Sequence, residues 1–301
     1  MATTSAVSWP SDEAARALQG PFGAADGAGG GSAPAPVRQR SEGRVRIAAA
    51  AFGGTTRVCD LAEAGALRVR VPRGGPGLEA VMVNVAGGVA CGDRFFVEAR
   101  AEAGAHLVVT TPAAEKVYRS DGPLAEIAVR LSAEAGARLE WLPQETILFD
   151  RARLARSYEI DLHPKAAFLS FEALVLGRLA HGDVMGEGLI ADRWRLRRGG
   201  GLVYADGFRL SGDIGALLAR PAVAGGRRAL GTLLYAAPDA EGRLEEARAL
   251  LAGARSDCGA SAWNGLLCVR FLAPDIETLR ADATSFLMSF RAAPLPRVWA
   301  T

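Results

Sequence analysis

Several acidic side chains of this 301-residue chain lie in or beside apolar, strand-like segments and not in charged runs. The clearest cases are the segments LEWLPQETILFD (139–150) and LSFEALVLGR (169–178). A carboxylate in such a segment is costly to bury unless it is paired or faces water inside the fold. These carboxylates are therefore the first candidates for chemistry, and they are Asp93, Glu115, Glu140, Glu145, Asp150 and Glu172.

Several interpretations of these six carboxylates stay open. They can form structural salt bridges with arginines such as Arg119, Arg151, Arg153 or Arg178. They can instead line a wet acidic path that binds a divalent cation weakly and then releases it. A carboxylate-based hydrolase would use two of them as acid and base. A purely structural β-solenoid would use none of them.

Other chemistry-bearing residues are few. The sequence contains no GxSxG, HExxH or EF-hand pattern and no phosphate-binding GxxxxGK[ST]. His106 lies on an apolar strand and is expected to be a hydrogen-bonded core residue, and His163 precedes a proline at an expected turn. His181 is either a ligand or a surface residue. The four widely separated cysteines are expected to be reduced and buried, and they are Cys59, Cys91, Cys258 and Cys268.

Composition narrows the functional class. The 35 basic and 33 acidic residues are spread along the chain and leave a formal charge of +2, which gives no footprint for a nucleic-acid backbone. No run of apolar residues approaches the roughly 18 that a membrane span needs, and the start of the chain lacks the pattern of a signal peptide. We therefore expect a cytoplasmic protein that contacts neither nucleic acid nor membrane.

The elements that must position the carboxylates are mostly strands. Residues 1–43 form a Gly/Ala/Pro-rich tract that is expected to be a flexible extension. From Arg44 onward short segments alternate with period two, and the segment AEAGA recurs at 62–66, 101–105 and 133–137. Three successive segments repeat a strand, a corner of small residues and a second strand.

The repeat predicts the architecture. Ala105, Ala137 and Ala167 occupy equivalent corners, 32 and 30 residues apart. This interval favours stacked β-coils or a layered pair of sheets, in which each rung buries its apolar face on the next. A run of ordinary hairpins in a sandwich is the alternative.

The pattern changes after Pro221. We predict strands at 229–236 and 265–272, a helix at 240–254, and a second helix that starts at Asp275 and ends before Pro294. The expected fold is thus mainly β, with stacked strands in β-helix or solenoid-like layered sheets and two C-terminal α-helices. It forms one β-rich domain over 44–301, whose last third, about 222–301, carries the helices.

The chain resembles the UreD family of urease accessory proteins, called UreH in some organisms, in six segments that keep the family's order and spacing. They are Asn84–Asp93 (NVAGGVACGD), Thr110–Ser120 (TTPAAEKVYRS), Leu139–Asp150 (LEWLPQETILFD), Phe171–Arg178 (FEALVLGR), Asp192–Arg195 (DRWR) and Leu295–Trp299 (LPRVW).

This resemblance implies a non-catalytic β scaffold. Proteins of this family bind UreF, which recruits the GTPase UreG, and the assembly docks on urease apoprotein and delivers nickel to it. The resemblance also implies a dimeric assembly bridged by UreF, no tightly bound cofactor, and nickel only in transit. The six carboxylates fall within the family's motif blocks, which implies that they line the nickel path.

Two departures from the family pattern stand out. Cys91 occupies a position where the family more often has glycine, and either Asp183 or Glu187 takes the place of the usual Gly-Glu pair after LGR. Within NVAGGVACGD, Gly92 predicts a tight turn that presents Asp93, while Gly87 and Gly88 are suited to positive φ or to a close backbone approach. Three aromatic residues are expected either at a partner surface or in the core, and they are Phe208, Trp263 and Trp299.

Overall fold

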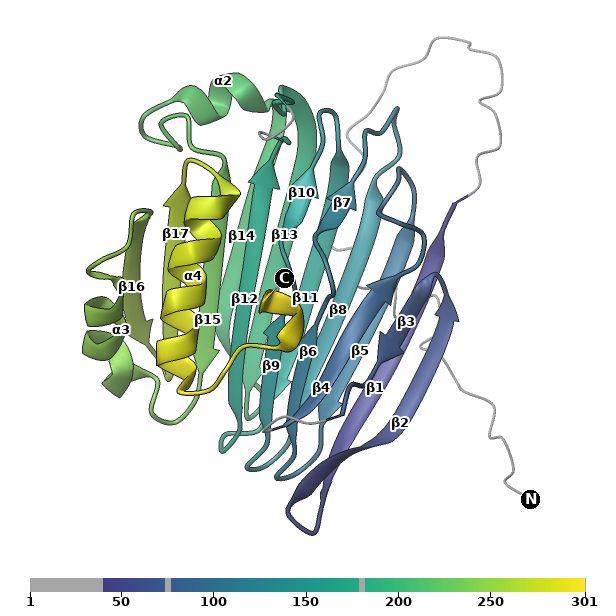
Figure 1. Ribbon diagram of the computed structural model, residues 1–301, viewed down its shortest axis with the longest axis vertical. Helices are drawn as coiled ribbons and strands as arrows, with labels where there is room; N and C mark the ends of the chain where they lie inside the picture. Colours follow the sequence, from purple (N-terminus) through teal and green to yellow (C-terminus); the bar gives the residue numbers. More distant parts are fainter. Residues whose placement is uncertain (1–39, 74–76, 179–181, 301) are drawn as a thin grey trace.

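The computed structural model describes residues 40–73, 77–178 and 182–300, which form two β-sheets stacked face to face (Figure 1). We call the seven-stranded sheet A and the ten-stranded sheet B. In spatial order, sheet A consists of β14 (Gly201–Asp213), β13 (Glu187–Arg198), β11 (Arg153–Leu162), β8 (Ala125–Ala133), β5 (Arg94–Ala101), β1 (Glu42–Phe52) and β2 (Thr55–Gly65).

Sheet B packs against sheet A and contains ten strands. In spatial order its main path consists of β16 (Asp257–Trp263), β17 (Leu266–Ala273), β15 (Ala229–Ala236), β12 (Ala167–Leu176), β9 (Arg138–Leu142), β6 (His106–Thr110), β4 (Leu78–Asn84) and β3 (Leu67–Arg70). Two short strands lie off this path, where β10 (Thr146–Leu148) pairs with both β12 and β7 (Glu115–Val117).

The chain builds the two sheets together, one rung at a time. It passes from β5 in sheet A to β6 and β7 in sheet B, then returns through β8, β9 and β10, and again through β11 and β12. Strands β5, β8, β11 and β13 pair in parallel in sheet A, as do β6, β9 and β12 in sheet B. The predicted solenoid-like stack of rungs is therefore confirmed.

Short turns form the corners between the sheets. The amide of Ala105 donates to the carbonyl of Glu102, and that of Ala137 donates to the carbonyl of Glu134. In the third rung the equivalent bond comes from Ala166, which is fully buried. The prediction that placed Ala167 at this corner was wrong by one residue, because the third corner follows after 29 residues and not after 30.

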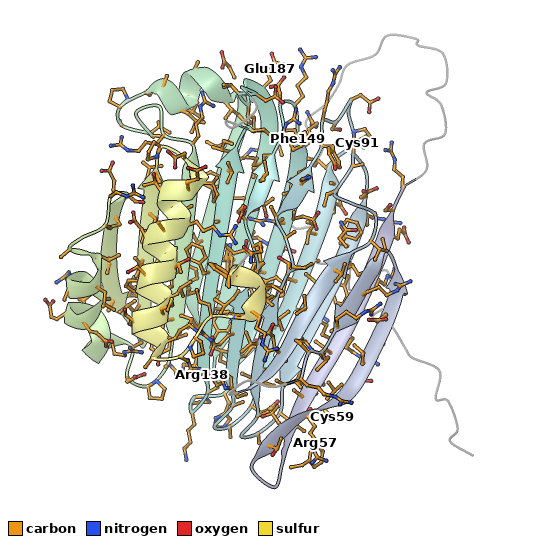
Figure 2. The ribbon with its side chains drawn as sticks, viewed as in Figure 1. Arg57, Cys59, Cys91, Arg138, Phe149 and Glu187 are labelled. Atoms are coloured by element: carbon orange, nitrogen blue, oxygen red, sulfur yellow. The ribbon has the colours of Figure 1, made fainter. Side chains whose placement is uncertain are left out.

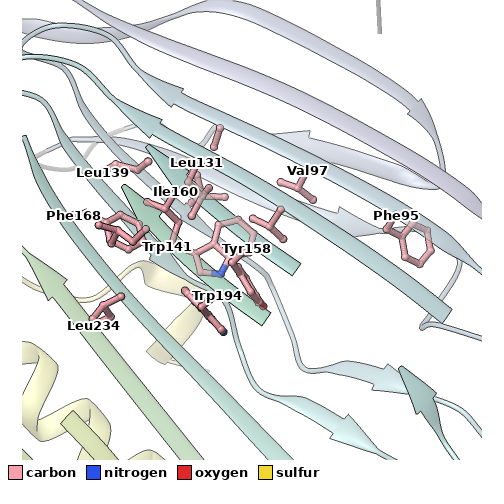
Figure 3. Packing of buried hydrophobic residues seen from close by; sticks show 14 of the residues in the cluster. Phe95, Val97, Leu131, Leu139, Trp141, Tyr158, Ile160, Phe168, Trp194 and Leu234 are labelled. Atoms are coloured by element: carbon pink, nitrogen blue, oxygen red, sulfur yellow. The ribbon is translucent and has the colours of Figure 1, made fainter. Parts of the chain in front are cut away.

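The main core lies between the sheets. Strands β5, β8 and β11 of sheet A alternate buried inward residues, most of them apolar, with more exposed outward residues, as a period of two requires. At the centre, Tyr158 stacks on Trp194 with ring centroids 3.8 Å apart and meets the edge of Trp141 at 6.5 Å (Figure 3). Aromatic side chains from three strands thus join the two sheets.

A second core covers the outer face of sheet B. Helices α3 (Leu244–Leu251) and α4 (Ile276–Arg291) pack on this face, and Phe286 and Phe290 of α4 lie close to Phe271 and Tyr235 of the sheet (Figure 1). The chain after α4 then crosses the same face and ends in the 3-10 turn η3 (Arg297–Ala300).

The helix predictions hold in kind and differ in extent. Helix α4 begins where predicted, because the side chain of Asp275 accepts a 2.8 Å hydrogen bond from the amide of Thr278. Helix α3 is shorter than the predicted helix at 240–254, because the first part of that range forms the 3-10 turn η2 (Glu241–Arg243). The short helix α2 (Ile214–Ala219) was not predicted.

Strand β1 begins at Glu42, two residues before the predicted domain boundary at Arg44. The rest of the predicted N-terminal extension lies outside the described residues, apart from Arg40 and Ser41. In the described part of the chain, the longest helix is too short and too polar to cross a bilayer.

Candidate functional site

The structure divides the six predicted carboxylates among three places. Glu115 and Glu172 point into the space between the sheets, on strands whose inward neighbours belong to the main core. Glu140 and Glu145 face the region under α4, where they contact Arg291 and Arg280. Asp93 and Asp150 lie in turns.

Glu172 is the centre of a buried polar cluster between the sheets. Its Oε1 accepts hydrogen bonds from Trp141 Nε1 at 2.6 Å and from the hydroxyl of Tyr158 at 2.7 Å. Its Oε2 accepts one from Arg156 at 3.2 Å. Burial raises the pKa of the Glu172 carboxyl, and the attraction of Arg156 and these donors offsets the rise only in part.

Arg156 connects this carboxylate to a second one. Its Nε and Nη2 donate to the two oxygens of Asp192 at 3.0 and 2.5 Å, a bidentate pairing, while its Nη1 also donates to the hydroxyl of Thr146 at 3.0 Å. Arg156 and Asp192 are direct partners in the parallel pairing of β11 and β13. The side chains of Arg156, Asp192 and Glu172 are each at most 7 % exposed.

Arg156 and Asp192 were not among the predicted site residues. A signal was present, because Arg156 falls between Leu154 and Tyr158 on the inward, apolar side of an alternating strand. Asp192 likewise lies between the inward residues Ile190 and Trp194. A charged residue on the buried side of two adjacent strands predicts an ion pair.

Glu115 lies further along the same interior space. Its carboxylate accepts hydrogen bonds from Asn84 Nδ2 at 3.3 Å to both oxygens, and burial raises its pKa to about 7. Its register partner on β10 is Thr146, the residue that also accepts from Arg156. Polar groups therefore follow one another between the sheets from Asn84 to the Glu172 cluster.

Glu140 is a structural ion-pair centre. It accepts from Arg291 Nε at 2.6 Å and from Arg138 Nε at 2.7 Å, and His106 Nε2 lies 2.9 Å from Oε1. Burial opposes ionisation, but the bond from His106 and the charges of Arg291 and Arg138 lower the pKa to about 2. The salt-bridge interpretation fits this residue, although its partners differ from the arginines suggested by the sequence.

Asp93 and Asp150 organise turns. Asp93 accepts from the amides of Ser41 and Ala90 at 2.8 and 2.7 Å, and it follows Gly92, whose φ of 79° agrees with the predicted tight turn. Asp150 accepts from the amides of Gly186 and Glu187 at 2.9 and 3.1 Å. Cys91, Phe149 and Glu187 lie at the same end of the sheets (Figure 2).

Other predicted residues have clear places. His106 is hydrogen-bonded as expected, and His163 Nδ1 accepts from the amide of Lys165 in a corner turn. His181 lies outside the described residues. Asp183 pairs with Arg178, whereas Glu187 opens β13 at an exposed position. Within the described ranges, no three His, Cys, Asp or Glu side chains are grouped so that they could hold a metal ion.

The cysteines and aromatic candidates divide between surface and core. All four cysteines are free thiols, but Cys59 is exposed and Cys258 is only half-buried, which corrects the expectation that they are all buried. Trp299 belongs to the core and donates from Nε1 to the carbonyl of Leu142 at 3.1 Å. Trp263 remains 36 % exposed, and Phe208 is half-buried against the main core.

A surface cleft of about 390 Å³ opens at another place, along β16 and β17. Its lining includes Val223, Leu272 and Arg270, and Asp257 is the one carboxylate among its lining residues. The closely placed carboxylates Glu172 and Asp192 lie in the core instead, shielded from solvent by the two sheets. This arrangement gives no support to a hydrolase that uses a pair of them in a pocket.

Comparison with known proteins places this two-sheet fold in a family. The sequence model described as UreD urease accessory protein matches residues 41–300, which includes both sheets and all the helices. The chain belongs to the UreD family. A urease accessory protein UreD of Xanthobacter autotrophicus is 72% identical over 299 residues, which cover 99% of this chain and 100% of that protein.

Other UreD proteins are also similar. The urease accessory protein UreD of Azorhizobium caulinodans is 64% identical over 269 residues, covering 89% of this chain and 99% of that protein. That of Methylobacterium sp. (strain 4-46) is 58% identical over 273 residues, covering 88% and 97%. All three relatives are named accessory proteins.

The segments that resemble UreD meet in space. Thr110 and Trp299 both donate to the carbonyl of Leu142, and Gln144 Nε2 donates to the carbonyl of Val298 at 3.0 Å. Asp192, from the DRWR segment, joins Glu172 of FEALVLGR through Arg156. The UreD-like segments thus surround the middle of sheet B and the polar cluster behind it.

Proposed function

We propose that this chain acts in urease maturation as a non-catalytic scaffold in the cytoplasm. It binds UreF, and through UreF the GTPase UreG, together with urease apoprotein, and helps to deliver nickel to the urease active site. The observation that carries the proposal is the UreD family match over residues 41–300. The dimeric assembly bridged by UreF belongs to the same proposal.

The layered fold suits a scaffold. Its two sheets share one continuous core, and a second core fixes α3 and α4 on sheet B. Interiors packed in this way resist deformation, so surfaces on opposite sides keep their spacing. A rigid body of this kind can hold partner proteins in a fixed relative position.

The polar groups between the sheets support a route for nickel. Of the six predicted carboxylates, Glu115 and Glu172 lie in this interior, with Thr146 and Arg156 between them. Carboxylate and hydroxyl oxygens bind divalent cations without the tight cage that several imidazoles or thiolates would form. The other four carboxylates lie outside this interior, in turns or under α4, and stay candidates for nickel contacts elsewhere on the chain. They are Asp93, Glu140, Glu145 and Asp150.

Glu115 has chemistry suited to transient binding. A carboxyl with a pKa of about 7 exists in both protonation states near neutral pH, so an arriving cation can displace the proton at little cost. When the cation leaves, the proton returns. No cofactor has to remain bound for this exchange, and nickel is cargo throughout.

Activation of urease in a host that carries the urease operon tests the proposal. We compare the unaltered chain with Glu115→Gln, Glu172→Gln and the matched control Glu245→Gln, whose side chain is 82% exposed on α3. The readouts are nickel per urease active site and co-purification of UreF and urease subunits.

The outcomes separate the parts of the proposal. Intact complexes with nickel-poor urease in the two interior variants, and normal urease with the control, support a route through the interior. Intact complexes with normal nickel content in every variant exclude Glu115 and Glu172 from the route. Full urease maturation without this chain contradicts the scaffold function itself.

A further inference from the structure

Among the residues that the structure describes, no helix covers the outer face of sheet A. Helices α3 and α4 pack against β15, β16 and β17 of sheet B, on the side that faces the viewer in Figure 1. The main contacts of the short helix α2 with strands are at the ends of β13 and β14. The outward side chains of the central strands of sheet A are partly exposed as a result.

Along one row of this face, charges of opposite sign alternate. Strand register places Arg46, Glu98, Arg130, Glu159 and Arg195 in one row across five parallel strands. Signs alternate at every step, and opposite charges on adjacent strands stabilise each other. The row ends on β14 at an alanine, so the last arginine has a carboxylate on one side only.

The pattern breaks at the β13 side of the sheet. Arg193, Arg195 and Arg197 project from alternate positions of β13 on this outward face. Glu159 forms ion pairs with two of them, at 3.7 Å from Arg193 and 3.1 Å from Arg197. Arg195 donates to the backbone carbonyls of Trp194 and Asp206 among the described residues, at 2.8 and 3.5 Å.

We call this region the arginine face. Over positions 153–161 of β11, 189–197 of β13 and 205–211 of β14, the outward side chains include five arginines and two carboxylates, a net of +3. They are Arg153, Arg193, Arg195, Arg197, Arg209, Glu159 and Asp161. Beyond these positions, the exposed register pair Glu187 and Asp213 adds two carboxylates at the end of the strands that carries α2.

Two further features suit this face to contact with a protein. The residues between the arginines are small, such as Ala155, Ser157 and Gly207, so a partner surface can approach the backbone closely. The buried Nε of Arg153 has no hydrogen-bond partner in the described part of the chain. Native proteins leave few buried donors unpaired, so the Arg153 guanidinium gains a hydrogen bond if its side chain turns outward to an acceptor on a partner.

We propose that the arginine face is a docking surface for a protein partner whose contact surface is acidic. Guanidinium groups pair with carboxylates through two parallel hydrogen bonds, and arginine is enriched in protein interfaces. An acidic partner would also relieve the repulsion among the three arginines of β13. Nucleic acid fits less well, because Glu159 and Asp161 lie within the face and would repel phosphates.

The inference rests on the proposed scaffold function in one respect, since urease apoprotein is the probe. The full chain is immobilised, and apoprotein binding is measured from about 0.05 to 0.5 M salt, where screening of exposed charges becomes strong. The test variant is Arg195→Glu with Arg209→Glu. The matched control, with the same change in charge, is Arg220→Glu with Arg248→Glu, two exposed residues that lie directly after α2 and on α3.

We expect the unaltered chain to lose affinity as salt rises. The test variant should bind about tenfold more weakly at low salt and show a flatter salt dependence, because opposed charges across an interface govern encounter and register. The control should stay within about twofold. If the reversed pair fails to fold, Arg195→Gln with Arg209→Gln is the milder test variant. Its affinity for apoprotein should be lower than that of the control, by less than the tenfold expected for charge reversal.

Other results overturn the inference. Equal binding by the test and control variants would place the urease contact elsewhere on the chain. Binding of duplex DNA that is as strong as apoprotein binding, and equally sensitive to the test variant, would make the face a general polyanion site. No binding of apoprotein by the unaltered chain, at any salt, would count against the inference and the scaffold function together.

Discussion

Arg291, the last residue of α4, donates a 2.6 Å hydrogen bond from Nε to Glu140 Oε2 in strand β9, 151 residues earlier in the sequence. Both side chains are at most 2% exposed. The same guanidinium donates to the carbonyl of Pro294 at 2.8 Å and so fixes the turn that leads to η3. One buried ion pair thus joins the rung stack to the C-terminal cover of sheet B.

We predict that Arg291→Met destabilises the fold by about 3 kcal/mol, because it leaves the buried Glu140 carboxylate short of a charged partner. Urea denaturation at pH 7 measures the change. Arg280→Met is the matched control, since Arg280 is 33% exposed and 3.7 Å from Glu145, and it should cost less than about 1 kcal/mol. Equal losses in the two variants would contradict a special role for the Arg291 pair.

Glu140 should also contribute to acid sensitivity. Its pKa of about 2 lies below the usual value of 4.5, so the folded state favours the ionised form. The resulting stabilisation, about 3 kcal/mol, is complete above pH 4.5 and is lost as pH falls toward 2. The difference in unfolding free energy between the unaltered chain and Glu140→Gln should therefore shrink over this range. A difference that is constant with pH would refute the assignment.

Glu115 should behave in the opposite way. Its pKa of about 7 in the folded state lies above 4.5, so the folded state holds the proton more tightly than the unfolded state does. Stability attributable to this group falls as pH rises from 4.5 to 7 and is constant above that. The quantity to compare is the unfolding free energy of Glu115→Gln minus that of the unaltered chain. This difference should be about 3 kcal/mol larger at pH 8 than at pH 4.5.

Denaturation at the two pH values checks this prediction, with Glu245→Gln as the control for removal of an exposed carboxylate. A stability gain that does not change between pH 4.5 and pH 8 would mean that Glu115 keeps an ordinary pKa. A loss at pH 8 would mean that the ionised form is stabilised by a partner.

Much of the fold could be predicted from the sequence because the rung repeat is local. Each rung contains its own alternation of apolar residues and its own corner, so Ala105 and Ala137 are recognisable without knowledge of the rest. The third corner was misplaced by one residue because it reads HPKA and lacks the glycine of AEAGA. Helix α2 was missed because six residues give too short a periodic signal.

The candidate site was less predictable, since its contacts join distant residues. Composition and neighbours correctly marked Glu140 and Glu172 as carboxylates in apolar surroundings. They could not show that Glu140 faces α4 while Glu172 faces sheet A. That depends on which side of β9 and β12 is covered by sheet A and which side by α4. The partner Arg291 is 151 residues from Glu140, a separation at which sequence pattern carries no information.

The corners give a test of backbone conformation. Gly104 and Gly136 have φ of 69° and 68°, whereas Lys165, at the equivalent place in the third corner, is not among the residues with positive φ. Gly136→Ala should cost roughly 1 to 2 kcal/mol in urea denaturation, because a Cβ disfavours the left-handed region. Space is not the cause, since a Cβ at Gly136 would meet nothing within 4 Å. Lys165→Ala should be near neutral, and a similar cost in both would contradict this account.

The cluster between the sheets offers a last test of what its charges do. Arg156 holds both Glu172 and Asp192, so Arg156→Met would leave two buried carboxylates without their cation, at a cost of about 3 to 5 kcal/mol. Asp192→Asn alone should cost less, because Arg156 keeps Glu172 as a partner. If the loss comes from uncompensated charge, Arg156→Met combined with Asp192→Asn should be more stable than Arg156→Met alone. A double-mutant cycle in urea measures this coupling, and additive losses would show that packing, and not charge, makes Arg156 necessary.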